Sequence, residues 1–413
     1  MYYGQMNSPT NGILRRTRRS EVRMLRLLFL RLACLLAANL LVARSGDLAD
    51  EPMTQKLDAL FQPLVDAQSP GLAVLVRKDG QTRFECGYGL RELRTHSNVD
   101  PYTNFRLASF TKQFTATAIM LIVHDGNLRY EETLAEIIPD FPAYGKNITV
   151  RNLLNHTSGL PDYEDLMDAV EKIKGPRWSP QHQIQDDEVL ALLKKETKGK
   201  FAPGTSWSYS NSGYVVLGVI VAKTSGKSYR DFLRERIFAP LKMNHTVVYQ
   251  KGKNEITNRA FGHTKQGDSF EQTDQSSTSA TLGDGGIYSN LKDLAKWDDA
   301  LRNHTLLTAE EMKPALTPAK LADGSQPRWP TEPNDDNLHP GKPVSYGFGW
   351  FLDPYESHGV HPRMWHTGST MGFRTVIERF IENNLTVIIL SNRTDLDPEK
   401  LALEVASYYP SLK

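Results

Sequence analysis

Apolar runs typical of β-strands lie at both ends of this chain, and the part between them is helical in pattern. Near the start, residues 72–77 and 82–88 are apolar-rich and are joined through Asp79 and Gly80, a dipeptide suited to the positive φ angles of a hairpin turn. Three further runs of this kind lie near the end: 346–352, 374–380 and 385–390. The economical arrangement is one antiparallel sheet built from both chain ends.

Helical spacing of apolar residues dominates the middle of the chain. The clearest helical segments are 114–123, 187–195, 214–224 and 291–301. A helix before the first strand and another over 398–408 would cover the sheet. We therefore predict an α+β fold, an antiparallel sheet flanked by helices with a mostly helical insertion. The sheet subdomain would span about 53–108 and 298–413 and the helical subdomain about 109–297, with 322–343 as a long loop over the site.

The first 45 residues differ from the rest in composition. A group of arginines precedes the apolar stretch 27–43, and the small residues Ala43, Ser45 and Gly46 offer a cleavage site. We predict a signal peptide or an N-terminal anchor over 1–45. Cleavage is favoured because Arg31 splits the stretch, leaving it short for a membrane span. The protein is then exported to the periplasm, the cell envelope or the medium, and an uncleaved leader would tether it to a membrane.

Charge and cysteine usage narrow the classes of function. The 49 basic and 48 acidic residues give a net charge of +1, so no field of one sign favours nucleic acid as a partner. Cys34 lies in the leader and Cys86 in a strand-like run, which leaves one thiol and no internal disulfide. No H-E-x-x-H motif occurs, and His358 with His361 is interpreted as a surface pair. We expect no metal and no cofactor.

Ser109-Phe110-Thr111-Lys112 places a hydroxyl and an amine three residues apart, so a helix brings them to one face. A serine nucleophile needs a base within hydrogen-bond reach and donors that stabilise the oxyanion formed on attack. Burial would favour the neutral form of Lys112, which could then accept the Ser109 proton. Because Ser109 begins the helix, the positive end of the helix dipole would face the developing negative charge.

The S-x-x-K pattern alone is weak, since about one or two occurrences arise by chance in a chain of this length. Ser289-Asn290-Leu291-Lys292 matches it equally well, but Ser289 is better interpreted as the N-cap of the following helix. Tyr102-Thr103-Asn104 and Tyr288-Ser289-Asn290 likewise imitate a Y-x-N motif. Order along the chain must therefore decide which motifs matter.

Two other motifs follow Ser109 along the chain, and their order is informative about the family. A turn-rich loop over 203–211 contains Tyr209 and Asn211, and near the end His366-Thr367-Gly368 leads into Ser369 and a strand. The three elements in this order resemble the serine β-lactamases and penicillin-binding proteins, most closely the class C branch with its Y-x-N second motif. The segments 152–160, 201–204, 285–289 and 346–350 also look like that family's recurring segments. The resemblance covers about 53–409 and implies a β-lactamase-related serine hydrolase domain over 46–413.

The resemblance implies a role for each motif residue. Ser109 would be the acylated nucleophile, and Lys112 with Tyr209 would form the proton-transfer pair. Asn211 would hold Lys112 and touch the substrate amide. The substrate-binding strand would contribute His366, Thr367, Gly368 and Ser369, and the oxyanion hole would consist of the backbone amides of Ser109 and Ser369. His156, by contrast, is expected to fix a loop through hydrogen bonds rather than to perform chemistry.

His366 stands where well-known relatives have lysine. Lysine is a cation that can hold a substrate carboxylate, whereas histidine is largely neutral near pH 7. This departure favours an esterase or a D-amino-acid peptidase or amidase over penicillin hydrolysis. We therefore predict an exported serine hydrolase that forms an acyl-enzyme on a small-molecule or peptide substrate, namely an ester, a D-amino-acid amide or a β-lactam.

Two alternatives remain at this level. A catalytically inactive relative would instead bind cell-wall peptide or a protein partner. The α/β-hydrolase fold is disfavoured because the sequence contains no G-x-S-x-G nucleophile elbow.

Overall fold

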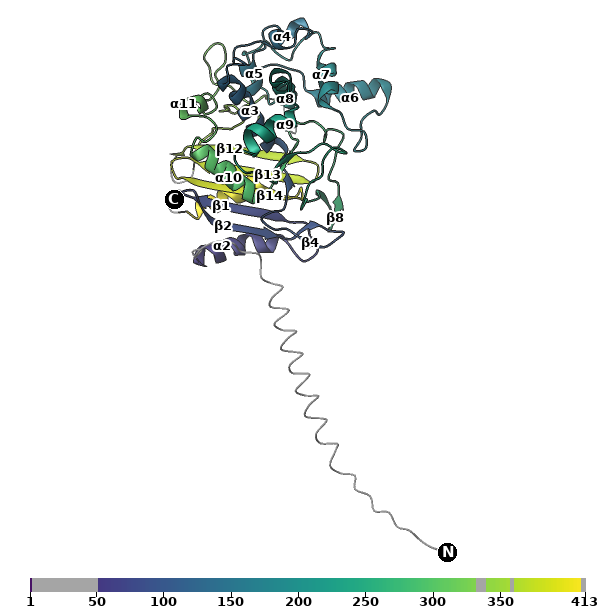
Figure 1. Cartoon of the computed structure of the whole chain (residues 1–413), viewed down its shortest axis with the longest axis vertical. Helices are drawn as coiled ribbons and strands as arrows, with labels where there is room; N and C mark the ends of the chain where they lie inside the picture. Colours follow the sequence, from purple (N-terminus) through teal and green to yellow (C-terminus); the bar gives the residue numbers. More distant parts are fainter. Residues whose placement is uncertain (2–50, 332–338, 357–359, 410–413) are drawn as a thin grey trace. The chain divides into compact units, whose positions relative to one another are not determined.

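The computed structural model describes residues 1, 51–331, 339–356 and 360–409, so the predicted leader after Met1, as well as His358, lies outside the described residues. Among these residues, a five-stranded antiparallel sheet has the order β12-β13-β14-β1-β2 (Figure 1). Its strands are β1 (Leu72–Lys78), β2 (Gln81–Tyr88), β12 (Arg363–Thr370), β13 (Phe373–Phe380) and β14 (Leu385–Ser391). Since β1 pairs with β14, the prediction of one sheet built from both chain ends is confirmed.

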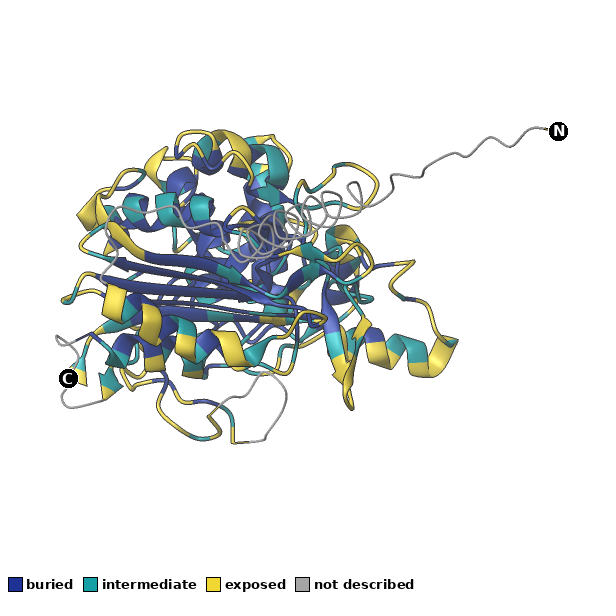
Figure 2. Ribbon diagram, turned by 90° about the horizontal axis from the view of Figure 1, so that it is seen from below, coloured by how far each residue is buried: buried dark blue, intermediate teal, exposed yellow. Residues whose placement is uncertain are grey.

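Successive side chains of β1 point to opposite faces of the sheet, and both faces are covered. Val74 and Val76 pack in an apolar cluster with helices α2 (Glu51–Phe61) and α12 (Pro398–Ser407), while Ala73 faces the larger core on the other side. Figure 2 shows the buried strands with helices whose outer faces are exposed. The continuous apolar run of β1 therefore reflects burial on both faces.

The hairpin between β1 and β2 turns at the predicted dipeptide. Asp79 has a φ of 53° and Gly80 a φ of 76°, values that suit the tight turns matching the twist of paired strands. Cys86 is a buried residue of β2, as predicted from its neighbours.

Other helices and helical turns lie on the second side of the sheet, where η2 (Ala108–Thr111) and α10 (Leu291–Arg302) pack directly on its strands (Figure 1). The remaining ones on this side are α3 (Lys112–His124), α4 (Leu134–Ile137), η3 (Ala143–Gly145), α5 (Val150–Leu154), α6 (Tyr163–Lys174), α7 (Asp186–Leu193), α8 (Asn211–Ser225), α9 (Tyr229–Leu233), the π-helix η4 (Arg234–Phe238) and α11 (Ala309–Met312). The predicted helices correspond to α3, α7, α8, α10 and α12. Most of α3 is buried, and this helix packs on α8.

Short strands complete the described part of the chain. One small sheet has the order β5 (Phe105–Arg106), β9 (Ile287–Ser289) and β6 (Val247–Val248). Two-stranded pairs are β3 (Leu90–Glu92) with β4 (Ser97–Asn98), β7 (His263–Gln266) with β8 (Ser269–Gln272), and β10 (Tyr355–Glu356) with β11 (Val360–His361). The β5–β9 pairing brings the residues before Ser109 beside those before α10.

Two local predictions are wrong. Residues 346–352 do not form a strand, because Gly349 takes a φ of 77° and Gly347 packs so closely that a Cβ would lie 1.8 Å from Ala315 O. Ser289 is not an N-cap: it is a buried residue of β9, and the Asn290 side chain caps α10 by accepting from Asp293 N. The division into sheet and helical subdomains stays a prediction.

Candidate active site

Ser109 lies in η2, the turn that leads into α3. It is the one residue between Thr103 and Ile122 that is not buried. The preceding residue, Ala108, has a φ of 50°, a left-handed conformation that costs a non-glycine residue free energy and is concentrated at functional sites. The backbone therefore bends sharply just before the hydroxyl, which opens toward the surface from an otherwise buried helix start.

Lys112 is fully buried one turn after Ser109. Its Nζ donates to Ser109 Oγ at 2.9 Å, to Asn211 Oδ1 at 2.8 Å and to the backbone oxygen of Asp284 at 3.2 Å. The structure thus brings the first and second predicted motifs together around one amine.

These partners determine how the amine can act as a base. An amide oxygen and a peptide carbonyl oxygen can only accept hydrogen bonds, whereas a serine hydroxyl can donate or accept. A neutral Lys112 amine can donate to Asn211 and to Asp284, and its lone pair can accept a hydrogen bond from the Ser109 hydroxyl. The geometry therefore suits transfer of the Ser109 proton to Lys112 Nζ.

Tyr209 stands on the loop just before α8. The Lys112 Nζ lies 4.8 Å from the centroid of its ring. The same ring stacks parallel to Phe351 at a centroid distance of 6.5 Å, and it lies 6.2 Å from the ring of His366. Asn211 follows as the first residue of α8, whose N-cap Ser210 accepts a hydrogen bond from Gly213 N. The N-cap thus fixes the chain between Tyr209 and Asn211.

His156 fixes this loop through hydrogen bonds, as predicted. Its Nδ1 accepts from Ser210 N at 3.1 Å and its carbonyl oxygen accepts from Ser208 N at 3.0 Å, so both neighbours of Tyr209 are fixed. The two ring centroids of His156 and Tyr209 lie 4.5 Å apart. Burial and then the charge of Lys112 hold the pKa of His156 well below 6.5, so the ring stays neutral.

The third motif lies on β12, an edge strand of the large sheet. Gly368 contacts the turn before Ser109 so closely that a Cβ would lie 2.0 Å from Leu107 O. Thr375 Oγ1 on β13 donates to the same carbonyl oxygen at 2.9 Å. Thr367 is half-buried and Ser369 is exposed. The sheet edge and the Ser109 turn therefore meet at Gly368, where only glycine fits.

His366 is buried and neutral. Burial and then the charge of Lys112 lower its pKa to about 3, although the contact with Thr367 O opposes this shift. Its Nδ1 lies 2.6 Å from that carbonyl oxygen, which requires an N–H there, and Nε2 is then left to accept from Tyr346 OH at 3.1 Å. His366 thus joins the aromatic cluster behind Tyr209 and carries no positive charge at neutral pH.

Two parts of the site were not singled out from the sequence. One is the backbone oxygen of Asp284, because a main-chain ligand leaves no signal in residue type. The other is the aromatic support of Tyr209: Phe351 stacks on Trp365 at 4.5 Å, and Trp329 from the long loop stacks on Phe351 at 5.7 Å.

In the described part of the chain, no group of three or more His, Cys, Asp or Glu side chains could hold a metal ion. The expectation of a metal-free, cofactor-free site stays a prediction.

Comparison with known proteins adds an independent line of evidence. A family model described as Beta-lactamase matches residues 57–408. Penicillin-binding protein 4* of Bacillus subtilis (strain 168) is 32% identical over 365 residues, which is 85% of this chain and 75% of that protein. The D-aminopeptidase of Cereibacter sphaeroides is 28% identical over 348 residues, covering 82% of this chain and 61% of that enzyme.

Among solved structures, the D-amino acid amidase from Ochrobactrum anthropi SV3 complexed with L-phenylalanine amide is similar to this chain. It superposes with a TM-score of 0.69 at 25% identity and covers 86% of this chain and 99% of the amidase. The predicted fold class is thereby confirmed.

Proposed function

Because this chain belongs to the β-lactamase family, we propose that it is a serine hydrolase that forms an acyl-enzyme on Ser109. The observation that supports this most directly is the 2.9 Å contact between Lys112 Nζ and Ser109 Oγ. The second support is that Asn211 Oδ1 and the Asp284 backbone oxygen accept hydrogen bonds from Nζ and hold the amine beside the serine hydroxyl.

In the proposed reaction, Ser109 Oγ attacks the substrate carbonyl carbon while its proton passes to Lys112 Nζ. The carbonyl oxygen becomes an oxyanion, for which we assign the backbone amides of Ser109 and Ser369. The bond to the leaving group then breaks, and the leaving alcohol or amine takes a proton through Tyr209. Water attacks the acyl-enzyme in the second half, its proton returns through the same pair, and the acid leaves with Ser109 restored.

The neutral state of His366 suggests the substrate class. A buried, uncharged imidazole supplies no cation for a substrate carboxylate at the edge of β12. We propose that the preferred substrates are esters or amides, D-amino-acid amides included, that lack a free carboxylate beside the scissile bond. Two of the similar proteins support this choice of substrate class, since one is a D-aminopeptidase and the other a D-amino acid amidase. Thr367 and Gly368 would line the edge where such a substrate lies, and Asn211 would touch its amide.

We also propose that the protein is exported and that the predicted leader over 1–45 directs it. Across 51–331, 339–356 and 360–409, no helix has the length and apolar character to cross a membrane. N-terminal sequencing of the protein recovered from its source would test the proposal. An N-terminus near residue 46 is expected, and a full-length cytoplasmic product would contradict export.

A hydrolysis panel tests the proposed activity. It would compare p-nitrophenyl esters, D- and L-amino-acid amides, D-Ala-D-Ala peptides and nitrocefin on the wild type and on Ser109→Ala. We expect turnover of an ester or amide that Ser109→Ala abolishes. Turnover that survives in this variant would refute the assignment, and no turnover together with tight peptidoglycan binding would favour the inactive binding protein.

A further inference from the structure

The segment Gly283-Asp284-Gly285-Gly286 passes close behind Lys112. Its glycines allow an unusually tight fit: a Cβ on Gly283 would lie 2.2 Å from Tyr214 O in α8. Gly285 lies against Ala108, just before Ser109, where a Cβ would be 3.6 Å away. The single carboxylate of this segment, that of Asp284, therefore lies in a crowded place between the Ser109 turn and α8.

The Asp284 side chain is almost fully buried, at 6% exposure. Its Oδ2 accepts a hydrogen bond from Tyr163 OH at 3.3 Å, while its Oδ1 is buried without a hydrogen-bond partner among the described residues. A carboxylate in such surroundings is costly, since buried charges are normally fully hydrogen-bonded or paired. A neutral side chain would be cheaper for the fold, so this carboxylate requires another explanation.

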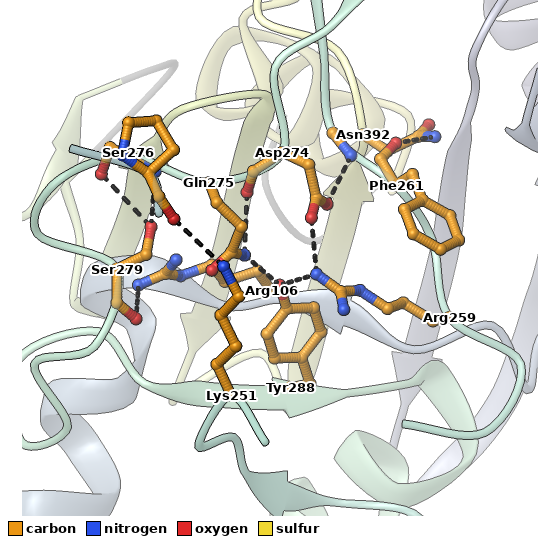
Figure 3. A network of polar contacts seen from close by, with 12 residues as sticks. Arg106, Lys251, Arg259, Phe261, Asp274, Gln275, Ser276, Ser279, Tyr288 and Asn392 are labelled. Carbon is orange, nitrogen blue, oxygen red and sulfur yellow. Dashed lines mark hydrogen bonds and ion pairs between the residues drawn. The ribbon is translucent and has the colours of Figure 1, made fainter. Parts of the chain in front are cut away.

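The segment itself is fixed from the other side. Arg106 Nε donates to Gly285 O at 3.3 Å and its Nη2 to Ser279 O at 3.1 Å. Figure 3 shows the contact of Arg106 with Ser279 beside a second anchor, in which Arg259 binds the Asp274 carboxylate and Tyr288 OH. Arg106 thus holds the carbonyl next to the one that accepts from Lys112.

Several titratable groups face Asp284 and Lys112. They are Tyr163 on α6, Asp186 on α7, Tyr229 on α9, Tyr214 on α8, Tyr209, and the rings of His156 and His366. Burial raises the pKa of Asp186 to about 8, with the hydrogen bond from Leu282 N opposing this and the charge of Asp284 adding to it. Below about pH 8, Asp186 is therefore protonated, and it adds no negative charge beside Asp284.

We propose that Asp284 is a positioning residue for the Ser109–Lys112 pair. Its backbone oxygen orients the Lys112 amine. Its carboxylate, hydrogen-bonded to Tyr163 OH, places a negative charge near that amine and so affects how readily the amine gains and loses its proton. This inference rests on the proposed function, because it assigns a role in the same acylation step. It adds a residue that lies outside the three motifs.

The proposal predicts a direction for the pH dependence. Acylation needs neutral Lys112, so its rate rises with pH as the amine loses its proton. A nearby negative charge favours the protonated amine. In Asp284→Asn, which keeps the shape and the backbone oxygen, the ascending limb of the rate profile should move to lower pH by about one unit, the lower end of the usual effect of an adjacent opposite charge.

The test measures the second-order rate constant for labelling by a fluorophosphonate probe from pH 5 to 10. Asp186→Asn is the matched control, because below about pH 8 it replaces a neutral carboxyl by a neutral amide and should leave the limb in place. If Asp284→Asn does not fold, Tyr163→Phe decides the question. It removes the hydrogen bond to Oδ2 but keeps the charge, so labelling should slow about threefold or more with no shift to lower pH.

Coinciding rates and pH profiles of wild type and Asp284→Asn would overturn the proposal, as would an unchanged rate in Tyr163→Phe when Asp284→Asn does not fold. Failure of the proposed function is a separate result, namely no labelling of the wild type at Ser109. Labelled wild type with an unaltered Asp284→Asn removes only the role of Asp284.

Discussion

Lys112 Nζ lies 2.9 Å from Ser109 Oγ, one helical turn away, in a site where the lysine is buried and the serine is not. The buried amine is shielded from water, while the hydroxyl can meet a substrate. The contact joins residues of one short motif, but the site depends on α8 and β12, which come from distant parts of the chain. Each of the following predictions changes one component of this arrangement.

Lys112→Arg tests whether the amine must lose its proton. A guanidinium stays protonated in proteins and cannot accept the serine proton. We expect labelling and turnover to fall about 10²- to 10⁴-fold. The second S-x-x-K sequence offers a matched control, since Lys292 pairs with Glu85 on β2. Lys292→Arg should keep full activity, and equal losses in the two variants would contradict the assignment.

Tyr209→Phe removes one hydroxyl and keeps the ring that stacks on Phe351. We expect kcat to fall about 10²- to 10⁴-fold with KM changed only a few-fold, because the proton-transfer step is impaired and the binding surface is kept. Tyr102 belongs to the decoy Y-x-N sequence and is 53% exposed. Steady-state kinetics of Tyr102→Phe should match the wild type. A Tyr209→Phe enzyme with normal kcat would exclude the phenol from the reaction.

Gly368→Ala should damage both stability and activity. The added methyl group would collide with Leu107 O, so β12 and the Ser109 turn must separate. We expect a loss of about 1–3 kcal/mol in the free energy of unfolding and at least a tenfold slower labelling. Gly175 provides the comparison: its φ is 79° but nothing lies within 4 Å of a Cβ. Gly175→Ala should cost about 1–3 kcal/mol, because a φ of 79° with a ψ of 173° is open essentially to glycine alone, and should leave the labelling rate unchanged.

His366→Gln tests the neutral histidine through its linkage to stability. The pKa is 6.5 in the unfolded chain and about 3 in the folded one, so below pH 6.5 the unfolded state binds the extra proton. Wild type should therefore lose stability relative to the variant by about 1.4 kcal/mol per pH unit as the pH falls from 6.5 toward 3.

Urea unfolding at pH 7, 6 and 5 measures the difference between wild type and His366→Gln. Glu378, whose pKa burial raises to about 8, has the opposite pH dependence, but it is present in both proteins and cancels in the difference. Parallel stability curves would mean that folding does not lower the pKa of His366.

Local chemistry explains which parts of the fold could be predicted. Asp79-Gly80 identified its hairpin because positive φ angles restrict the choice of residues there. The predicted strand over 346–352 was wrong because its aromatic residues pack around a turn that contains glycines. A buried aromatic run without alternation was therefore mistaken for a strand. The strand over 363–370 was expected only from the family resemblance, since a sequence that contains Arg363, Thr367 and Ser369 lacks an apolar pattern.

The site could be predicted only as far as side chains carry the chemistry. Ser109, Lys112 and Asn211 were identified by type and order, and the structure brings them into hydrogen-bond contact. The carbonyl oxygen of Asp284 could not be identified from the sequence. Every residue has such an oxygen, and only the tertiary fold brings this one to Lys112 Nζ. The decoy at Ser289 was set aside for the wrong local reason, as the capping residue is Asn290.

The central claim is that the Ser109 hydroxyl is the nucleophile. Its most direct test is labelling with a fluorophosphonate probe, followed by peptide mass mapping of wild type, Ser109→Ala and the decoy variant Ser289→Ala. We predict one adduct, on Ser109, in wild type and in Ser289→Ala, and none in Ser109→Ala. An unlabelled wild type, or an adduct that persists in Ser109→Ala, would contradict the account.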